Sequence, residues 1–529
     1  MSWSRRSFFL VSCGVLVLVA AVAVGQGTAN NSPPNITVSK EVTRAVGPLT
    51  DDGYVDYLGA VNASLGKGVT AANNANVLFW RALGPHPENA TMPPKFFQLM
   101  GIDSPPEDGE YFVNLSQFIR DGGNIEFQDP LWEKIFNQQG KASSRPWKSK
   151  DYPHIAEWLV ANEKPLALVV EGSRRTKYYS PLVLPENNDE GIENTMVSVL
   201  LPGVQKSRSF ARALTARAML RTRNGKTAAA WEDLLACHRL GRLVGRGPTL
   251  VEGLVGMAID GIAIQADLAF LEHTKPDVCQ ISKYQQDLAS LAPLPDVGAS
   301  IDLCERFMFL DVTQNLARYG SKRINEVLGH DNGFEKLLRV IFLRTVDWDT
   351  VMRNGNLWYD RIVEAVQTPD RKSRNLAMGL IEADLAKLGK EAASPMQFIR
   401  IALGSNKAVG KATSNVLIGF LLPAVSAAQT AEDRSVQQVH NLQVALALAA
   451  YRSDHDAYPE SLKQLAPRYL KKVPGDMFSG KSLVYEPTDT GYLLYSFGRN
   501  EKDDGGKSYD DEPESDDLRI QMPMPPNRE

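Results

Sequence analysis

The sequence predicts a mostly α-helical protein, built from multi-helix layers, that ends in a small α+β module. At 529 residues the chain is too long for one ordinary core. Apolar residues recur at helical spacing across 195–404, with Leu200, Val204 and Ala211 among them. Near the C-terminus, two short strand-like runs flank Asp489-Thr490-Gly491, which is typical of a hairpin. In that module we expect a long helix to pack on a short antiparallel sheet.

The N-terminus has the pattern of an export signal. Arg5 and Arg6 precede an apolar run over 8–24, and polar residues follow it. The run would form about 25 Å of helix, which is shorter than the ~30 Å hydrocarbon core and favours a cleaved signal. An uncleaved anchor over 1–26, with membrane contact through residues 8–24, stays open, as does the export route. We expect the protein in the periplasm or on the outer face of the cytoplasmic membrane of a bacterium.

Composition divides the rest of the chain into further segments. Residues 27–50 are polar and contain Pro33-Pro34, which predicts a flexible linker. Residues 51–194 mix short helices with proline-rich connections, and we expect an irregular, mostly helical domain. Residues 195–404 form the α-helical domain, in which Asn224-Gly225 ends one helix and Thr249 caps another.

Few motifs point to chemistry. A net charge of −4 gives no basic surface for nucleic acid, so we expect no nucleic-acid partner. The stretch 404–413 resembles a phosphate-binding loop, but its glycines are wrongly spaced and Ala412 replaces the metal-binding hydroxyl, so we interpret it as a linker. The seven histidines form no hydrolase or metalloprotease motif. His238 lies one turn beyond Leu234 on a predicted helix, which favours a hydrogen-bonded histidine in a core or groove.

Cysteine spacing also excludes a zinc site. Outside the signal the chain has Cys237, Cys279 and Cys304, an odd number without a C-x-x-C pair. A disulfide between Cys279 and Cys304 is one interpretation, and buried free thiols are the favoured one.

Residues 405–506 carry the strongest local signals. A helix is predicted over 426–451 and is apolar nearly all round from Leu442 onward, so it should be buried against a sheet. Ala457-Tyr458-Pro459 ends it, and a short second helix follows over 461–465. The apolar stretch 416–425 just before it is too short to span a bilayer.

The order of these elements resembles the globular module of the major pseudopilins of type II secretion systems. The matching segments are a long helix, a Tyr-Pro turn, a short helix, a turn with aspartate and phenylalanine, and strands, here at 446–451, 457–459, 462–465, 473–478 and 495–498. Ala424 stands where pilins carry glutamate at the fifth mature position, and over 400 residues precede it. We therefore do not expect processing as a pilus subunit. The rest of the chain resembles uncharacterised exported bacterial proteins, from which no activity carries over.

An acidic loop follows the hairpin. Between Glu501 and Asp517 there are nine acidic and two basic residues. The resemblance implies a calcium loop near here, with Asn500, Asp503 and Asp504 as candidate ligands, and oxygen-rich loops suit that ion. The favoured alternative is a solvated acidic, proline-rich tail over 507–529.

No reaction class is indicated by these patterns. The leading hypothesis is an exported envelope protein of non-enzymatic interaction or scaffold type, with envelope proteins as partners and a link to secretion machinery. The alternative is an exported hydrolase or small-ligand-binding protein with a site between the first two domains. A pocket that joins His154, His238 or His273 to carboxylates would favour this alternative.

Overall fold

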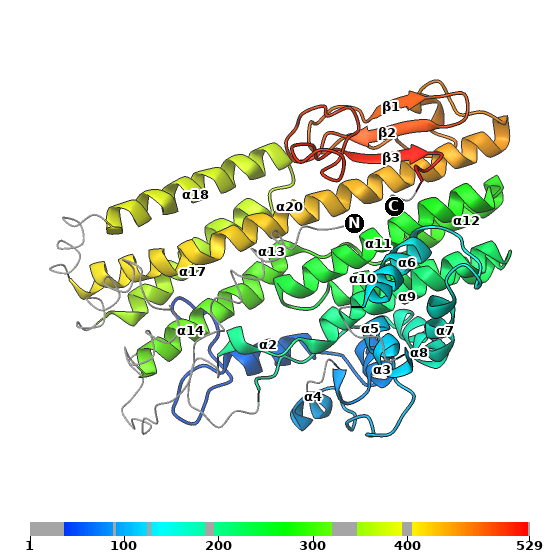
Figure 1. Ribbon diagram of the computed structural model, residues 1–529. Helices are drawn as coiled ribbons and strands as arrows, with labels where there is room; N and C mark the ends of the chain where they lie inside the picture. Colours follow the sequence, from blue (N-terminus) through cyan, green and yellow to red (C-terminus); the bar gives the residue numbers. More distant parts are fainter. Residues whose placement is uncertain are drawn as a thin grey trace.

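Long helices lie side by side along most of the molecule, and a three-stranded sheet covers one end of the longest of them (Figure 1). The computed structural model describes residues 36–87, 91–123, 129–185, 195–319, 346–393 and 405–526. The predicted export signal lies outside these ranges, and so does 333–344, a segment of the α-helical domain that the sequence predicts as helix. The described chain is mostly helical, with a small antiparallel sheet near its C-terminus, as the sequence predicts.

The first part of the chain contains short helices. These are α2 (Tyr57–Leu65), α3 (Ala75–Leu83), α4 (Pro94–Leu99), α5 (Leu115–Gly123), α6 (Pro130–Ser144), α7 (Pro153–Ala161), α8 (Glu163–Ser173) and the 3-10 turn η3 (Met196–Ser198). Longer helices follow: α9 (Pro202–Arg223), α10 (Thr227–Val244), α11 (Leu250–Thr274), α12 (Val278–Ala289), α13 (Val297–Ser300), the π-helical turn η4 (Ile301–Glu305), α14 (Arg306–Tyr319), α17 (Trp348–Val366) and α18 (Arg371–Ala393).

Two predicted helix boundaries are confirmed. Gly225 follows α9 with a φ of 71°, a left-handed conformation that glycine adopts without strain. Thr249 caps α11, where its side chain accepts a hydrogen bond from the Glu252 backbone N–H while the Glu252 carboxylate accepts one from the Thr249 backbone. The two boundaries leave α9, α10 and α11 as successive helices that pack on one another.

The longest helix, α20 (Asn406–His455), corrects the interpretation of 404–413 as a linker. From Asn406 onward that stretch is helix, and so is the apolar stretch 416–425. Gly410, one of the glycines in this stretch, lets α20 pack closely on the segment before α17. A Cβ at this position would lie only 2.7 Å from the Asp347 carbonyl oxygen. Packing against α11, α17 and α18 thus stabilises a helix that local sequence did not predict.

Among the described residues, two helices are long and apolar enough to cross a membrane by length and composition, namely α11 and α20. The apolar window of α11 is 72% buried inside the protein and that of α20 is 54% buried. Neighbouring parts of the protein therefore cover much of the apolar surface of α11 and α20, as they do for the core helices of a globular fold.

The buried residues form two hydrophobic cores. The first joins α3–α12 to the C-terminal half of α20 and to the sheet. The second joins the first described residues to α14, α17, α18 and the N-terminal half of α20. The expected flexible linker over 27–50 is thus wrong for its described part, since Ile36 and Val42 are 4% and 0% exposed in the second core. Asn356 fixes this segment by donating a hydrogen bond to the Val42 carbonyl, a tertiary contact without a local sequence signal.

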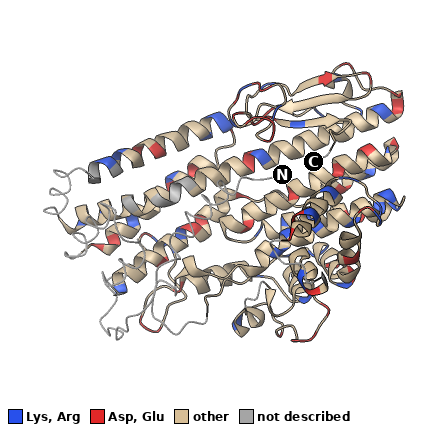
Figure 2. Ribbon diagram, viewed as in Figure 1, with Lys and Arg blue, Asp and Glu red and all other residues tan. Residues whose placement is uncertain are grey.

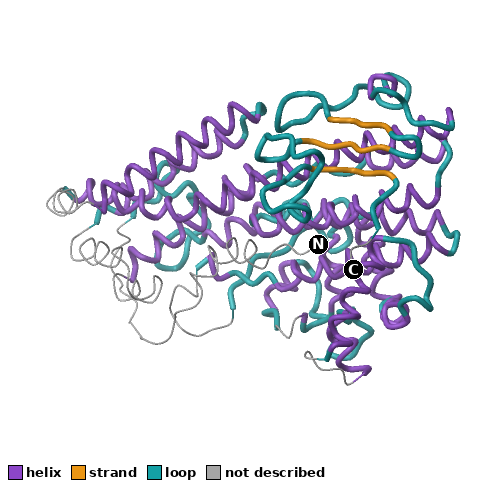
Figure 3. Tube along the Cα trace, turned by 45° about the horizontal axis from the view of Figure 1, so that its top comes forward, coloured by secondary structure: helices purple, strands orange, loops and turns teal. Residues whose placement is uncertain are grey.

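The sheet has the order β1–β2–β3 and is antiparallel throughout. β1 (Val484–Pro487) and β2 (Tyr492–Ser496) form the predicted hairpin, and η6 (Leu462–Leu465) is the predicted short helix. β3 (Leu518–Met522) lies within the segment expected to be a solvated tail. Its alternate residues are buried, and Asn441 on α20 donates a hydrogen bond to the Leu518 carbonyl. The three strands lie side by side over helices of the body, as the orange segments of Figure 3 show. Strand β3 was not predicted because its alternation of buried and exposed residues covers only five positions and follows directly on the acidic stretch 501–517.

Candidate functional site

The interior between α10 and α11 contains a network of charged side chains. We call His238, Arg242, Asp260 and Asp267 the His238 network. His238 and Arg242 lie one turn apart on α10, and the two aspartates lie two turns apart on α11, so each pair shares a helix face. The histidine and both aspartates are at most 1% exposed.

Both ring nitrogens of His238 face a carboxylate. Nδ1 lies 2.7 Å from Asp260 Oδ1, and Nε2 lies 2.8 Å from Asp267 Oδ2. Arg242 donates two further hydrogen bonds to Asp260, at 3.1 and 3.2 Å. A histidine can donate from both nitrogens only when it is protonated. Two cations and two anions therefore compensate one another in a dry interior.

The protonation of His238 follows from these partners. Burial alone would lower its pKa, but the charges of Asp267 and Asp260 and their hydrogen bonds raise the pKa to about 9. The positive charges of His238 and Arg242 lower the pKa of Asp260 against the effect of burial. Burial raises the pKa of Asp267, whose Oδ1 has no hydrogen-bond partner. Asp267 is thus the member whose charge depends most on His238.

This geometry suits stabilisation better than catalysis. A catalytic histidine keeps one nitrogen free for the reacting group while a carboxylate orients the other. In the His238 network both nitrogens are occupied, and the ring is sealed from solvent. The expectation of a buried, hydrogen-bonded histidine is confirmed. His273 is exposed and His154 half-buried, and both ring nitrogens of His238 are bonded to aspartates and not to either of these histidines.

A second buried charge on α10 has partners on α9. Asp233 is 1% exposed and accepts hydrogen bonds from Arg217 at 2.7 and 3.1 Å and from Arg221 at 2.6 Å. The two arginines lie one turn apart on α9, so both reach the same carboxylate. Buried ion pairs therefore connect α10 to both of its neighbours.

Two glycines allow α10 and α11 to approach closely. A Cβ on Gly241 would lie 2.8 Å from the Gly256 carbonyl oxygen, and a Cβ on Gly256 would lie 2.5 Å from the Gly241 carbonyl oxygen. Contacts this short are with backbone, which cannot move aside easily. The absence of side chains here lets His238 reach the aspartates of α11.

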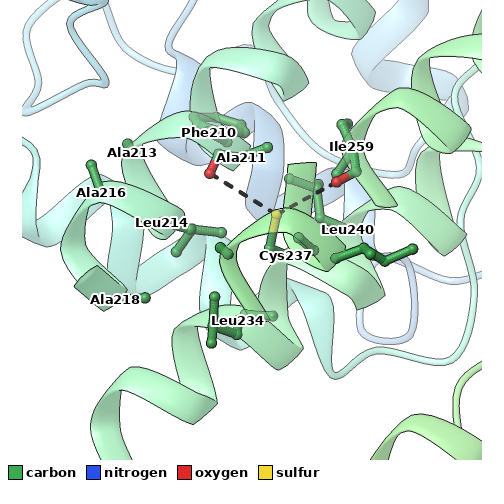
Figure 4. Packing of buried hydrophobic residues seen from close by; sticks show 14 of the residues in the cluster. Phe210, Ala211, Ala213, Leu214, Ala216, Ala218, Leu234, Cys237, Leu240 and Ile259 are labelled. Atoms are coloured by element: carbon green, nitrogen blue, oxygen red, sulfur yellow. Dashed lines mark hydrogen bonds between the residues drawn. The ribbon is translucent and has the colours of Figure 1, made fainter. Parts of the chain in front are cut away.

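Cys237 lies beside the network and points into the apolar core. Its Sγ lies 4.0 Å from the Ala211 carbonyl on α9 and 3.9 Å from the Ile259 carbonyl on α11 (Figure 4). Burial raises the pKa of the thiol, and the nearby aspartates raise it further, so the thiolate is disfavoured. Cys237, Cys279 and Cys304 are all free, and Cys279 is exposed rather than buried as we had expected.

The segments expected as the first two domains, 51–194 and 195–404, enclose a small cavity where they meet. It is lined by Trp80, Phe96 and Tyr178 on one side and by 200–204 on the other. Its volume is about 10 Å³, which is room for one water molecule. A substrate would not fit into this cavity without rearrangement.

The C-terminal loop brings several carboxylates together. Asp504 Oδ2 accepts hydrogen bonds from the Asn500 side chain at 2.8 Å and from the Asp516 backbone at 3.1 Å. Asp503 Oδ1 accepts one from the Tyr495 hydroxyl at 2.9 Å. Asp517 accepts two from backbone N–H groups with Oδ2, while its buried Oδ1 has no partner. Within the described ranges, no group of three or more His, Cys, Asp or Glu is arranged to hold a metal ion.

Sequence reasoning singled out His238 but not its partners. Asp260 and Asp267 stand 22 and 29 residues further along the chain, so no local motif links them to the histidine. One signal was present: α11 is otherwise largely apolar, and carboxylates inside such a helix need buried partners.

The raised pKa of His238 predicts how stability depends on pH. The folded protein holds this proton up to pH about 9, whereas an unfolded histidine releases it near 6.5. The contribution of His238 to the free energy of unfolding is therefore complete below pH 6.5. It is lost as the pH rises to 9, by up to about 3 kcal/mol. Urea unfolding at pH 7 and pH 9 should show this fall, and His238→Gln should flatten it. An equal slope in this variant would assign the pH dependence to other groups.

The chain matches no family model, no curated protein and no solved structure in the comparisons made.

Proposed function

We propose that this protein is exported to the bacterial cell envelope and acts there as a scaffold that binds other proteins, without a reaction of its own. The observation that carries the proposal is the sealed His238 network. His238 has both ring nitrogens bound to carboxylates and holds α10 against α11. The export pattern at 5–24 supports the location.

The C-terminal module supports the choice of partner. A long helix, a Tyr-Pro turn, a short helix and a hairpin follow one another in the order of the pseudopilin module that the sequence resembles. The module also belongs to the first hydrophobic core through α20, so a partner bound there would be held rigidly to the helical body. Components of the secretion machinery are the partners we propose.

Affinity capture from envelope extracts tests this proposal. A tagged full-length chain, crosslinked in living cells, should recover secretion-system components reproducibly. The matched control is the chain without residues 1–26, which should stay in the cytoplasm and recover none. Failure of the exported form to recover any of these components would contradict the proposed partners. N-terminal sequencing of the fractionated protein would decide between a cleaved signal and an anchor.

The second candidate is an exported hydrolase or small-ligand-binding protein with its site between the first two domains. Trp80, Tyr178 and Asn76 supply aromatic and polar groups in the cavity at that place. A volume of about 10 Å³ disfavours it, since ligand pockets are larger by more than tenfold. Hydrolytic activity of the purified chain on envelope polymers would favour this candidate over the scaffold.

Calcium is the ligand we propose for the C-terminal loop. The unpartnered Oδ1 of Asp517 and the carboxylate of Asp504 are oxygen groups of the kind that this ion prefers. Burial raises the pKa of Asp517 to about 6, with Asp504 and Asp503 adding to the rise. A cation would relieve this repulsion. Asn500, Asp503 and Asp504 are all engaged in hydrogen bonds of the loop, so the ion would bind Oδ1 of Asp517 first, with the neighbouring Asp504 carboxylate as its second ligand.

Calcium should therefore stabilise the protein. At a free calcium concentration about tenfold above its Kd, calcium should add about 1.4 kcal/mol to the free energy of unfolding. We expect the Tm to rise at about 1 mM CaCl₂, as for extracellular calcium modules, and less with MgCl₂. Asp517→Asn should remove the calcium-dependent rise, and Asp489→Asn, an equal charge change at an exposed turn, should leave it intact. Equal responses of the two variants would argue against a site at Asp517.

A further inference from the structure

Helix α18 has one buried and one exposed face. Arg374, Met378, Ile381 and Leu385 face the second core at successive helical turns. On the opposite side of the helix, Leu376 and Leu380 are 68% and 60% exposed. Two leucines one turn apart at such exposure do not contribute to the folding of the chain.

The exposed leucines belong to a longer row. We define the outer stripe as the residues of α18 that project away from its buried face: Lys372, Leu376, Gly379, Leu380, Ala383 and Lys387. Their spacing of 4, 7, 8, 11 and 15 residues from Lys372 keeps them on one face of a helix. All six are exposed, and a Cβ added to Gly379 would meet no atom within 4 Å. The centre of the stripe is apolar and each end carries a lysine.

The acidic residues of α18 are held to its sides. Glu382 accepts a hydrogen bond from the Ser426 hydroxyl on α20 at 2.6 Å, and Asp384 pairs with Arg361 on α17 at 2.8 Å. Lys372 and Lys387, in contrast, form no salt bridge among the described residues, although hydrogen bonds from Ser373 and the charge of the nearby Lys372 together lower the pKa of the Asp370 carboxyl. Figure 2 shows basic residues toward both ends of α18. The outer stripe therefore presents positive charge around an apolar centre.

We propose that the outer stripe docks on the anionic headgroup surface of a phospholipid bilayer. The leucines would enter the boundary between headgroups and acyl chains, and the lysines would lie at lipid phosphates. This inference goes beyond the proposed scaffold role, because it names a lipid surface and a part of the chain remote from the C-terminal module. It also differs from the membrane contact expected through residues 8–24.

Charge complementarity favours lipid over a second copy of the chain. An antiparallel pair of stripes that places Leu376 opposite Ala383 also places Lys372 opposite Lys387. A pair that places Leu376 opposite Leu380 brings Lys372 to Asp384, whose carboxylate is already paired with Arg361. Like charges in direct opposition are destabilising, whereas lipid phosphates would compensate each lysine.

A fluorescent label on the stripe tests the proposal. Gly379→Cys places a thiol where there is open space, and Ser replaces Cys13 and the exposed Cys279 so that one accessible thiol remains. An environment-sensitive dye there should shift to the blue with phosphatidylglycerol-containing vesicles, and far less with pure phosphatidylcholine. The matched control is Gly140→Cys on α6, which also has open space around it and should not respond. Both labelled chains carry residues 8–24, so insertion of that segment affects them alike.

Two double variants complete the test. Leu376→Ser with Leu380→Ser should lower the apparent affinity of the stripe for anionic vesicles by roughly tenfold. Lys372→Glu with Lys387→Glu should abolish the preference for anionic lipid. The proposal is overturned if the dye does not shift, if it shifts equally with neutral vesicles, or if it shifts with protein concentration alone, which would indicate self-association. These outcomes are independent of the capture experiment, so either proposal can fail without the other.

Discussion

Replacing His238 with leucine should destabilise the protein by about 3–5 kcal/mol. Leucine is close to histidine in volume, so the change removes the positive charge and both hydrogen bonds without leaving a large cavity. Within the part of the chain that the structure describes, Asp267 would lose the only hydrogen-bond partner of its carboxylate, and Asp260 would keep Arg242 alone. Thermal and urea unfolding followed by circular dichroism would measure the loss.

The neighbouring residue supplies a matched control. Arg239 lies next to His238 on α10 and forms a partly exposed pair with Glu232 at 3.3 Å. Arg239→Gln also removes one positive charge, but it should cost no more than about 1 kcal/mol, as for surface ion pairs. If both variants lost the same stability, burial of the His238 network would not be the cause.

A second substitution separates lost charge from lost packing. Adding Asp267→Asn to His238→Leu removes the carboxylate that the first change leaves uncompensated. We expect the double variant to be more stable than the sum of the two single changes predicts, since the residues are in direct contact. Additive effects would instead indicate that His238 stabilises the core through packing alone.

Much of the helical fold could be predicted because its boundaries are local. Asn224-Gly225 and the Thr249–Glu252 capping box mark helix ends through groups within a few residues of each other. The start of α20 could not be predicted in this way. Gly410 weakens a helix by its intrinsic propensity, and only the close approach to Asp347 gives it a structural reason.

The His238 network was also hard to predict, because its members meet through contacts between residues far apart in the sequence. His238 could be assigned to a core from its apolar neighbours on α10, but Asp260 and Asp267 meet it only after α11 has folded back. In the C-terminal loop, the resemblance to pseudopilins and the acidic composition indicate Asn500, Asp503 and Asp504 as candidate ligands. The loop oxygen that the structure leaves buried without a hydrogen-bond partner is instead Oδ1 of Asp517, which precedes the buried Leu518 of β3.

Replacing Gly256 with alanine should destabilise the protein by about 2 kcal/mol or more, against the normal helix preference for alanine. Its Cβ would meet the Gly241 carbonyl oxygen at 2.5 Å and the Gly245 backbone at 2.6 Å, so α10 and α11 would have to separate. Separation would also lengthen the hydrogen bonds from His238 to Asp260 and Asp267. The pH dependence of stability between 7 and 9 should therefore weaken in this variant as well.

Gly253 on the same helix gives the control. It is buried like Gly256, but the nearest atom to an added Cβ is on Pro295 at 3.9 Å, an ordinary van der Waals contact. Gly253→Ala should thus stabilise the protein by up to about 1 kcal/mol through helix propensity. Opposite signs for two identical substitutions three residues apart would identify the close crossing of α10 and α11 as the cause. Stabilisation by both would show that the helices can separate without loss, and the His238 network would then not depend on that crossing.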